Sequence, residues 1–175
     1  EFPHPNHTSI DSLMNRLNAL HEEDERSFPR VTTAPTFLYI KAGIYEIEGH
    51  YVKIKYAINI VGAGQGKTTL YGGIQIEGNE KQGKRVGLSL MTVRNLSGNG
   101  LYCEGQHKRK LSFLCQSMTF NLCHRHGVSA SNTKGRLINC GITQCKESGI
   151  YCGGGSLIEL EGSLTKVDGN CMSGY

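Results

Sequence analysis

One segment of the chain recurs almost four times, and this repeat limits the possible folds more than any other feature. Similar sequence occupies residues 86–103, 113–130, 135–152 and, less closely, 155–172. Equivalent glycines follow one another at intervals of 27, 22 and 20 residues, and these are Gly100, Gly127, Gly149 and Gly169. A repeat of this length and irregularity is typical of a solenoid, in which each coil buries its inner face only against its neighbours.

The repeated segments have the pattern of strands. They are short apolar runs rich in Val, Ile, Leu, Phe and Thr, with strict alternation and with Gly, Asn and Ser turns between them. The 23 glycines suit a fold with a turn every few residues. Leucine-rich repeats and four-stranded propeller blades have other signatures. We therefore predict an all-β fold, a right-handed parallel β-helix of roughly five to seven coils, with one inner column formed by Leu88, Cys115, Leu137 and Leu157.

The segment 1–30 precedes the strands and has a different period. Its apolar residues have helical spacing, and they are Ile10, Leu13, Met14, Leu17 and Leu20. Residues 8–11 resemble a capping box at the start of a helix. We predict an amphipathic helix that caps the amino-terminal end of the solenoid. A helix that binds a partner or a membrane surface is the alternative, and the acidic polar face argues against the membrane.

We assign residues 31–175 to the β-helix itself. Its last coil has no polar cap, and an open end of stacked strands needs covering. We therefore expect the β-helix to be truncated at its carboxyl-terminal end, with either further chain or self-association there. No apolar run approaches the roughly 18 residues that span a bilayer, so no membrane association is expected.

Three early segments carry a family resemblance. Residues 38–48, 58–64 and 68–72 resemble the first coils of the pectin-lyase-like superfamily, especially pectin methylesterases. The later turns 99–102 and 148–151 are similar to the β-helix repeats of carbohydrate-binding proteins and sugar hydrolases. The resemblance covers roughly residues 36–175 and implies the right-handed β-helix fold with a polysaccharide as ligand or substrate.

The catalytic residues of those families have few counterparts. Between Thr36 and Val167 the sequence has no aspartate, so the paired aspartates of pectin methylesterases and polygalacturonases and the calcium-binding aspartates of pectate lyases are missing. His126 lies in a turn that resembles the Gly-His-Gly turn of polygalacturonases, although every repeat has a turn there. Glu159, Glu161 and Asp168 are the remaining candidates for general acid or base, because two of them share one strand face.

Basic loops and tyrosines are the candidate ligand-binding residues. Two loops one coil apart are basic and should meet when the coils stack, and their cations include Lys84, Arg85, Lys108, Arg109 and Lys110. Such a basic ridge attracts an acidic polysaccharide or a nucleic-acid backbone, and we favour polysaccharide. The alternative is that these charges only keep the loops solvated. Tyr102 and Tyr151 occupy the same repeat position, so they form either a stacking ladder for sugar rings or lateral packing.

Two further motifs suggest binding sites. Residues 62–68 resemble a phosphate loop, but its spacing differs by one residue and no helix follows, so we interpret it as a turn. The seven cysteines fall at apolar repeat positions and are interpreted as reduced, mostly buried thiols. Zinc bound by Cys123, His124, His126 and Cys145 is the weaker alternative; we expect no metal and no cofactor. Reduced thiols favour an intracellular or virus-associated protein without excluding an extracellular one.

The function that these features favour is a non-catalytic β-helix module that recognises polysaccharide along one flank or displays that surface in a larger assembly. One alternative is a carbohydrate-active hydrolase, lyase or epimerase of the pectin-lyase-like superfamily. The other is a structural or oligomerisation unit without a ligand. Fold alone does not decide between them, because function depends on the site.

Overall fold

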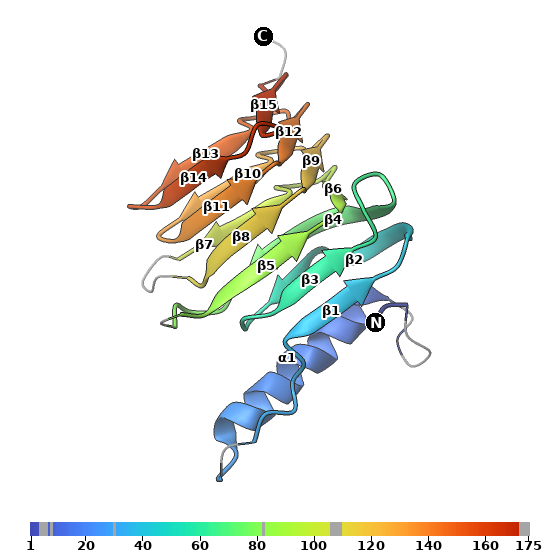
Figure 1. Ribbon diagram of the computed structural model, residues 1–175, viewed down its shortest axis with the longest axis vertical. Coiled ribbons are helices and arrows are strands. Elements are labelled where there is room, and N and C mark those ends of the chain that lie inside the picture. Colours follow the sequence, from blue (N-terminus) through green and yellow to red (C-terminus); the bar gives the residue numbers. More distant parts are fainter. Residues whose placement is uncertain (4–6, 8, 30, 82, 106–109, 172–175) are drawn as a thin grey trace.

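The computed structural model describes residues 1–3, 7, 9–29, 31–81, 83–105 and 110–171. One helix is followed by strands that coil into a parallel β-solenoid of about six turns (Figure 1). The predicted fold class is thereby confirmed.

The solenoid has three flanks. The first is a sheet of β1 (Phe37–Ile40), β3 (Asn59–Gly62), β5 (Arg85–Ser89), β8 (Ser112–Gln116), β11 (Lys134–Ile138) and β14 (Leu157–Glu161). The other two belong to one sheet that folds at a corner, because β4 (Thr68–Ile76) pairs with two different strands along its length.

The second flank contains the first halves of β2 (Gly43–Ile54) and β4, then β6 (Thr92–Arg94), β9 (Thr119–Asn121), β12 (Gly141–Thr143) and β15 (Lys166–Asp168). The third contains the second halves of β2 and β4, then β7 (Leu101–Glu104), β10 (Val128–Ser131) and β13 (Ile150–Gly153). All of these strand pairs are parallel.

Strand register places similar side chains in columns inside the solenoid. Leu88 pairs with Cys115, which pairs with Leu137, as the sequence predicted. The last member is Leu160, and the prediction of Leu157 is wrong. The turn before β14 is one residue longer than the turn before β11, and it contains Gly154 and Gly155 at φ of 55° and 73°. The extra residue raises the spacing of paired residues from 22, for Cys115 and Leu137, to 23, for Leu137 and Leu160, whereas the sequence alignment assumed 20.

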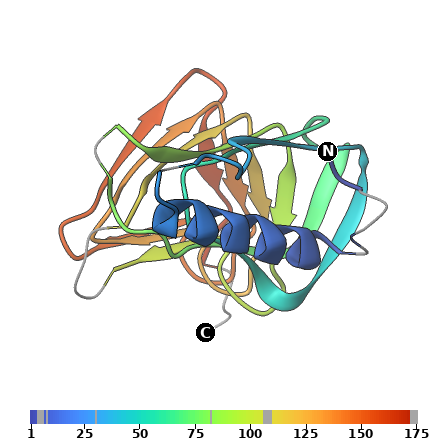
Figure 2. The same ribbon diagram turned by 90° about the horizontal axis from the view of Figure 1, so that it is seen from below.

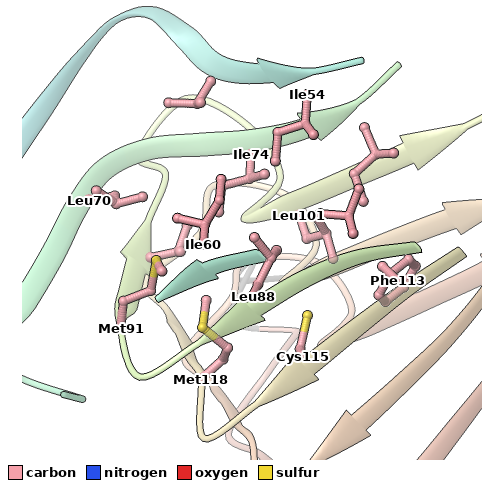
Figure 3. Packing of buried hydrophobic residues seen from close by; sticks show 14 of the residues in the cluster. Ile54, Ile60, Leu70, Ile74, Leu88, Met91, Leu101, Phe113, Cys115 and Met118 are labelled. Atoms are coloured by element: carbon pink, nitrogen blue, oxygen red, sulfur yellow. The ribbon is translucent and has the colours of Figure 1, made fainter. Parts of the chain in front are cut away.

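The interior is a continuous apolar core (Figure 3). Its residues come from strands of successive coils, so each coil is covered by the next. Five of the seven cysteines are buried in it as free thiols, and these are Cys103, Cys115, Cys123, Cys140 and Cys145. Burial raises the pKa of Cys103 to about 11, which keeps that thiol protonated and unreactive at neutral pH. Cys152 and Cys171, in the last coil, are exposed.

The helix α1 (Ile10–Arg26) lies across the amino-terminal end of the solenoid (Figure 2). Its apolar stripe is buried against the first coil. The Asn18 side chain donates to the Lys53 carbonyl at 2.8 Å and accepts from the Lys55 N–H at 3.1 Å, so it bonds the open edge of β2. Phe2 pairs with Ile40 at the edge of the first flank. Together these contacts satisfy edge groups that would otherwise attract another strand.

The opposite end of the solenoid is open in the described part of the chain. Leu137 is fully buried, whereas Leu160, its neighbour in the last coil, is 50 % exposed. Val167 and Cys152 are likewise exposed, although their partners in the preceding coil, Ile142 and Ala130, are fully buried. Among the described elements, no helix is both long and apolar enough to cross a bilayer.

Candidate functional site

The third flank carries a row of polar and aromatic side chains on its outer surface. Alternation along β7, β10 and β13 sends residues such as Leu101 inward and their neighbours outward. Register aligns Tyr102 with Ser129 and Ser129 with Tyr151. Since neighbouring strands are about 4.8 Å apart, the two tyrosines lie roughly two rungs, or about 10 Å, from each other. We call this row and the side chains that contact it the tyrosine flank.

Glu104 is held as a hydrogen-bond acceptor in the tyrosine flank. The Tyr102 hydroxyl donates to one carboxylate oxygen at 3.1 Å, and the Ser129 hydroxyl donates to the other at 3.0 Å. Burial and the Glu104 carboxylate raise the pKa of Tyr102, so its phenol remains a donor. Each carboxylate oxygen accepts one bond from the protein and keeps a further lone pair that can accept a ligand hydroxyl group.

Aromatic rings lie on both sides of this carboxylate. The ring of Tyr51 lies 5.8 Å from that of Tyr102 at an angle of 40°. One coil beyond Ser129, Tyr151 stacks on His126 with ring centroids 5.0 Å apart and an angle of 15°. Tyr151 is 46 % exposed, so one face of its ring is available to a ligand. Flat apolar rings flanked by polar groups are what a sugar ring requires.

A network of contacts among Arg125, His126 and Glu147 borders the tyrosine flank at the corner with the second flank. The His126 Nε2 lies 3.1 Å from the Glu147 carboxylate, which also lies 3.5 Å from the Arg125 guanidinium. The Nδ1 atom of His126 is buried and has no partner in the described part of the chain. The residue after His126 is Gly127, where a larger residue would not fit because its Cβ atom would lie 2.4 Å from the Ile142 side chain. The network fixes the ring on which Tyr151 stacks.

The acids proposed for catalysis are not brought together. Glu159 and Glu161 lie on the first flank, and both form ion pairs with Arg136. Asp168 lies on the second flank, where Lys166 at 3.0 Å is the main cause of its lowered pKa. Paired carboxylates for glycoside hydrolysis must face one substrate, and these three residues do not share a flank.

The described ends of the predicted basic loops meet at the corner between the third and first flanks. Asn79 and Lys110 form an isolated bridge between them, and the Lys110 ammonium donates to the Glu77 carbonyl at 2.8 Å. Lys84 lies just before β5, and Arg85 is the first residue of that strand. Lys108 and Arg109 lie outside the described residues.

A cavity of about 670 Å³ lies at the same corner, between α1 and the solenoid, and Lys84 lines it. Two ion pairs cross it, Lys55 with Glu22 at 3.0 Å and Lys81 with Glu25 at 2.8 Å. These pairs join the carboxyl-terminal half of the helix to the solenoid. The charged groups of the cavity are therefore largely occupied in holding α1, which makes the tyrosine flank the better candidate.

Asp24, which also lines this cavity, fixes the chain after the helix. The Ala34 N–H, the Thr33 hydroxyl and the Thr33 N–H all donate to its carboxylate, and these bonds lower the pKa of Asp24. Its oxygens are thereby committed to the backbone, and the residue has a structural role.

Two other motifs do not form sites among the described residues. In the loop 62–68, the N–H groups of Ala63, Gly64, Gly66, Lys67 and Thr68 all donate to protein oxygens, so they are not available to a phosphate. No group of three or more His, Cys, Asp and Glu side chains in the described ranges could hold a metal ion. Cys123 and His124 lie in the turn after β9, where Cys123 is buried and His124 is exposed.

The sequence identified Tyr102, Tyr151 and His126 but missed Tyr51 and the role of Glu104. The signal that would have found Glu104 is its place two residues after Tyr102, which puts both side chains on one face. Tyr51 comes from a coil outside the recognisable repeat, and only strand pairing locates it. No model of a known protein family matches the chain, and no curated protein or solved structure matches it either.

Proposed function

We propose that the protein recognises polysaccharide along the tyrosine flank without cleaving it. The observation that carries the proposal is the arrangement of Tyr102 and Glu104 on one coil and of Tyr151 two coils later on the same flank, which sets an exposed ring two rungs beyond a carboxylate acceptor. The rungs repeat at about 4.8 Å, and the residues of an extended glycan follow one another at a comparable distance. A glycan parallel to the solenoid axis would therefore meet Tyr102 and Glu104 at one rung and the Tyr151 ring two rungs later.

The resemblance to the pectin-lyase-like superfamily supports the same class of ligand. The resemblance of residues 38–48 to pectin methylesterases and of the later turns to carbohydrate-binding repeats agrees with the parallel β-solenoid. We therefore propose a pectin-lyase-like β-helix that has kept glycan recognition. Glu159 and Glu161 are both paired with Arg136, and Asp168 lies on another flank, which favours a binding module over an enzyme.

Self-association remains a second proposal, and the open last coil favours it. Leu160 is 50 % exposed at a position that is buried in each preceding coil. Apolar side chains and unpaired strand edges at one end favour contact with further strands. A module displayed in an assembly would combine this contact with a free tyrosine flank.

Replacing Tyr151 with alanine should weaken glycan binding without unfolding the protein. The loss of one stacked ring costs about 1 kcal/mol, or roughly a fivefold increase in Kd.

Replacing Glu104 with glutamine removes a charged acceptor and should weaken binding about tenfold. The measurement is an array of neutral and acidic glycans, followed by calorimetry with the oligosaccharide that binds.

The matched control is Tyr39→Ala, which removes an exposed tyrosine from the first flank and should leave Kd unchanged. If the array shows no binding, or if Tyr39→Ala weakens binding as much as Tyr151→Ala, the glycan does not bind the tyrosine flank. Hydrolysis of the oligosaccharide during the titration would favour the enzyme instead.

A further inference from the structure

Arg94 lies on the second flank, away from the row of tyrosines 102 and 151. It is the last residue of β6 and pairs with Tyr71 of the preceding coil. Continuing the register of β6 with β9 places Asn121 beside it in the next coil. Strand alternation directs all three side chains outward, so Arg94 lies between a phenol and an amide.

The guanidinium of Arg94 has no carboxylate partner. No Asp or Glu oxygen in the described ranges lies within 4.0 Å of it, whereas four other arginines are paired, and these are Arg16, Arg26, Arg125 and Arg136. Arg94 is also half-buried, and its Nε–H is inaccessible and without an acceptor in the described part of the chain. Removing a cation from water without an opposite charge is costly.

The neighbours of Arg94 prepare it for an anion. Its Nη1 donates to the Tyr71 hydroxyl oxygen at 3.3 Å, and its Cζ lies 6.0 Å from the centre of that ring. Because the Tyr71 oxygen accepts this bond, its own proton is free to donate elsewhere. The Asn121 amide group donates to Thr143 and Gln144. It is therefore not used in a hydrogen bond with the Arg94 guanidinium.

We propose that Arg94 and Tyr71 bind the oxyanion of an acidic glycan, a carboxylate or a sulfate group. The Nη2 of Arg94 and the Tyr71 hydroxyl supply two donors from adjacent rungs, and a guanidinium presents its donors in the planar geometry that an oxyanion accepts. The inference rests on the proposed function because it takes a glycan as the ligand. It adds that the glycan is acidic and that its charge is read on a flank separate from the sugar-stacking tyrosines.

The test is calorimetry with three probes: an oligogalacturonate hexamer, the same hexamer with methyl-esterified carboxyl groups, and a sulfated galactan hexamer. The wild-type protein should bind at least one charged probe about tenfold more tightly than the ester. Arg94→Gln should abolish this preference, and Tyr71→Phe, which removes only the hydroxyl, should reduce it about threefold. Arg16→Gln, an exposed and ion-paired arginine of α1, is the matched control and should change nothing. Tighter binding of the oligogalacturonate than of the sulfated galactan would identify a carboxylate as the group that Arg94 binds, and the reverse would identify a sulfate.

The outcomes separate this inference from the proposed function. If all probes bind equally, or if Arg94→Gln keeps the preference for charge while Tyr151→Ala weakens every probe, the oxyanion site is wrong and the tyrosine flank stands. If charged probes bind through Arg94 and Tyr151→Ala has no effect, the tyrosine flank is wrong and the oxyanion site stands. If no probe binds, both are wrong. Unfolding curves of each variant show that the fold is retained.

Discussion

Replacing Phe113 with alanine should destabilise the protein by about 3 to 5 kcal/mol. Phe113 is 2 % exposed and belongs to an inner column in which it pairs with Val86 on one side and Gly135 on the other. A Cβ atom on Gly135 would lie only 2.2 Å from the Phe113 ring. The glycine of one coil therefore provides the space for the phenylalanine of the coil before it.

This pairing predicts how the two positions interact. Gly135→Ala alone should cost about 1 to 3 kcal/mol by overpacking. In the double variant the new methyl group enters the space that the ring has left, so the combined loss should be smaller than the sum by about 1 kcal/mol or more. Urea unfolding measures all three free energies. Phe28→Ala, at a fully exposed phenylalanine, should change stability by less than about 0.5 kcal/mol, and strictly additive losses would show that the two residues do not share a column.

Replacing Met14 with aspartate should remove the helical cap. Met14 is 1 % exposed on the stripe of α1 that covers the first coil, and a carboxylate there would be buried without a partner. We expect a loss of at least about 3 kcal/mol of stability, from the lost side chain and the unpaired charge together. The edge of β2 would then be uncovered, so the variant should also associate more strongly at high concentration.

Asn15→Asp is the matched control for this variant. It introduces the same charge at the next position of the helix, where the side chain is exposed, so stability should change by less than about 0.5 kcal/mol. Urea unfolding and light scattering are the measurements. Equal stability and equal association of the two variants would mean that α1 does not protect the end of the solenoid.

The sequence predicted the architecture well because successive repeats of a solenoid place similar apolar residues at the same inward-facing position. The turn glycines, the strand alternation and the apolar stripe of α1 each follow from local pattern. The exception, Leu157 in place of Leu160, arose where the repeat is weakest: aligning Gly149 with Gly169 implied a spacing of 20 residues, whereas β11 and β14 pair at a spacing of 23. The repeat length does not give the number of residues in each turn. The register of that coil is therefore known only from the hydrogen bonds between its strands.

The site was predicted less completely, because it depends on which side chains meet across coils. Tyr102 and Tyr151 share a repeat position and could be found from the sequence. The bond from Ser129 to Glu104 and the place of Arg94 beside Tyr71 require the register of strands about 25 residues apart. Glu159, Glu161 and Asp168 looked like neighbours in the sequence, yet the corner between the flanks separates them.

The most direct test of the account is an amide spectrum of the isotope-labelled protein, titrated with an oligosaccharide that the array identifies. We predict that a neutral oligosaccharide shifts signals of β7, β10 and β13, with Tyr102, Ser129 and Tyr151 among the largest changes, that an acidic one also shifts Tyr71 and Arg94, and that the first flank is unaffected. Shifts confined to the first flank, or to the cavity beside α1, would contradict glycan recognition along the tyrosine flank.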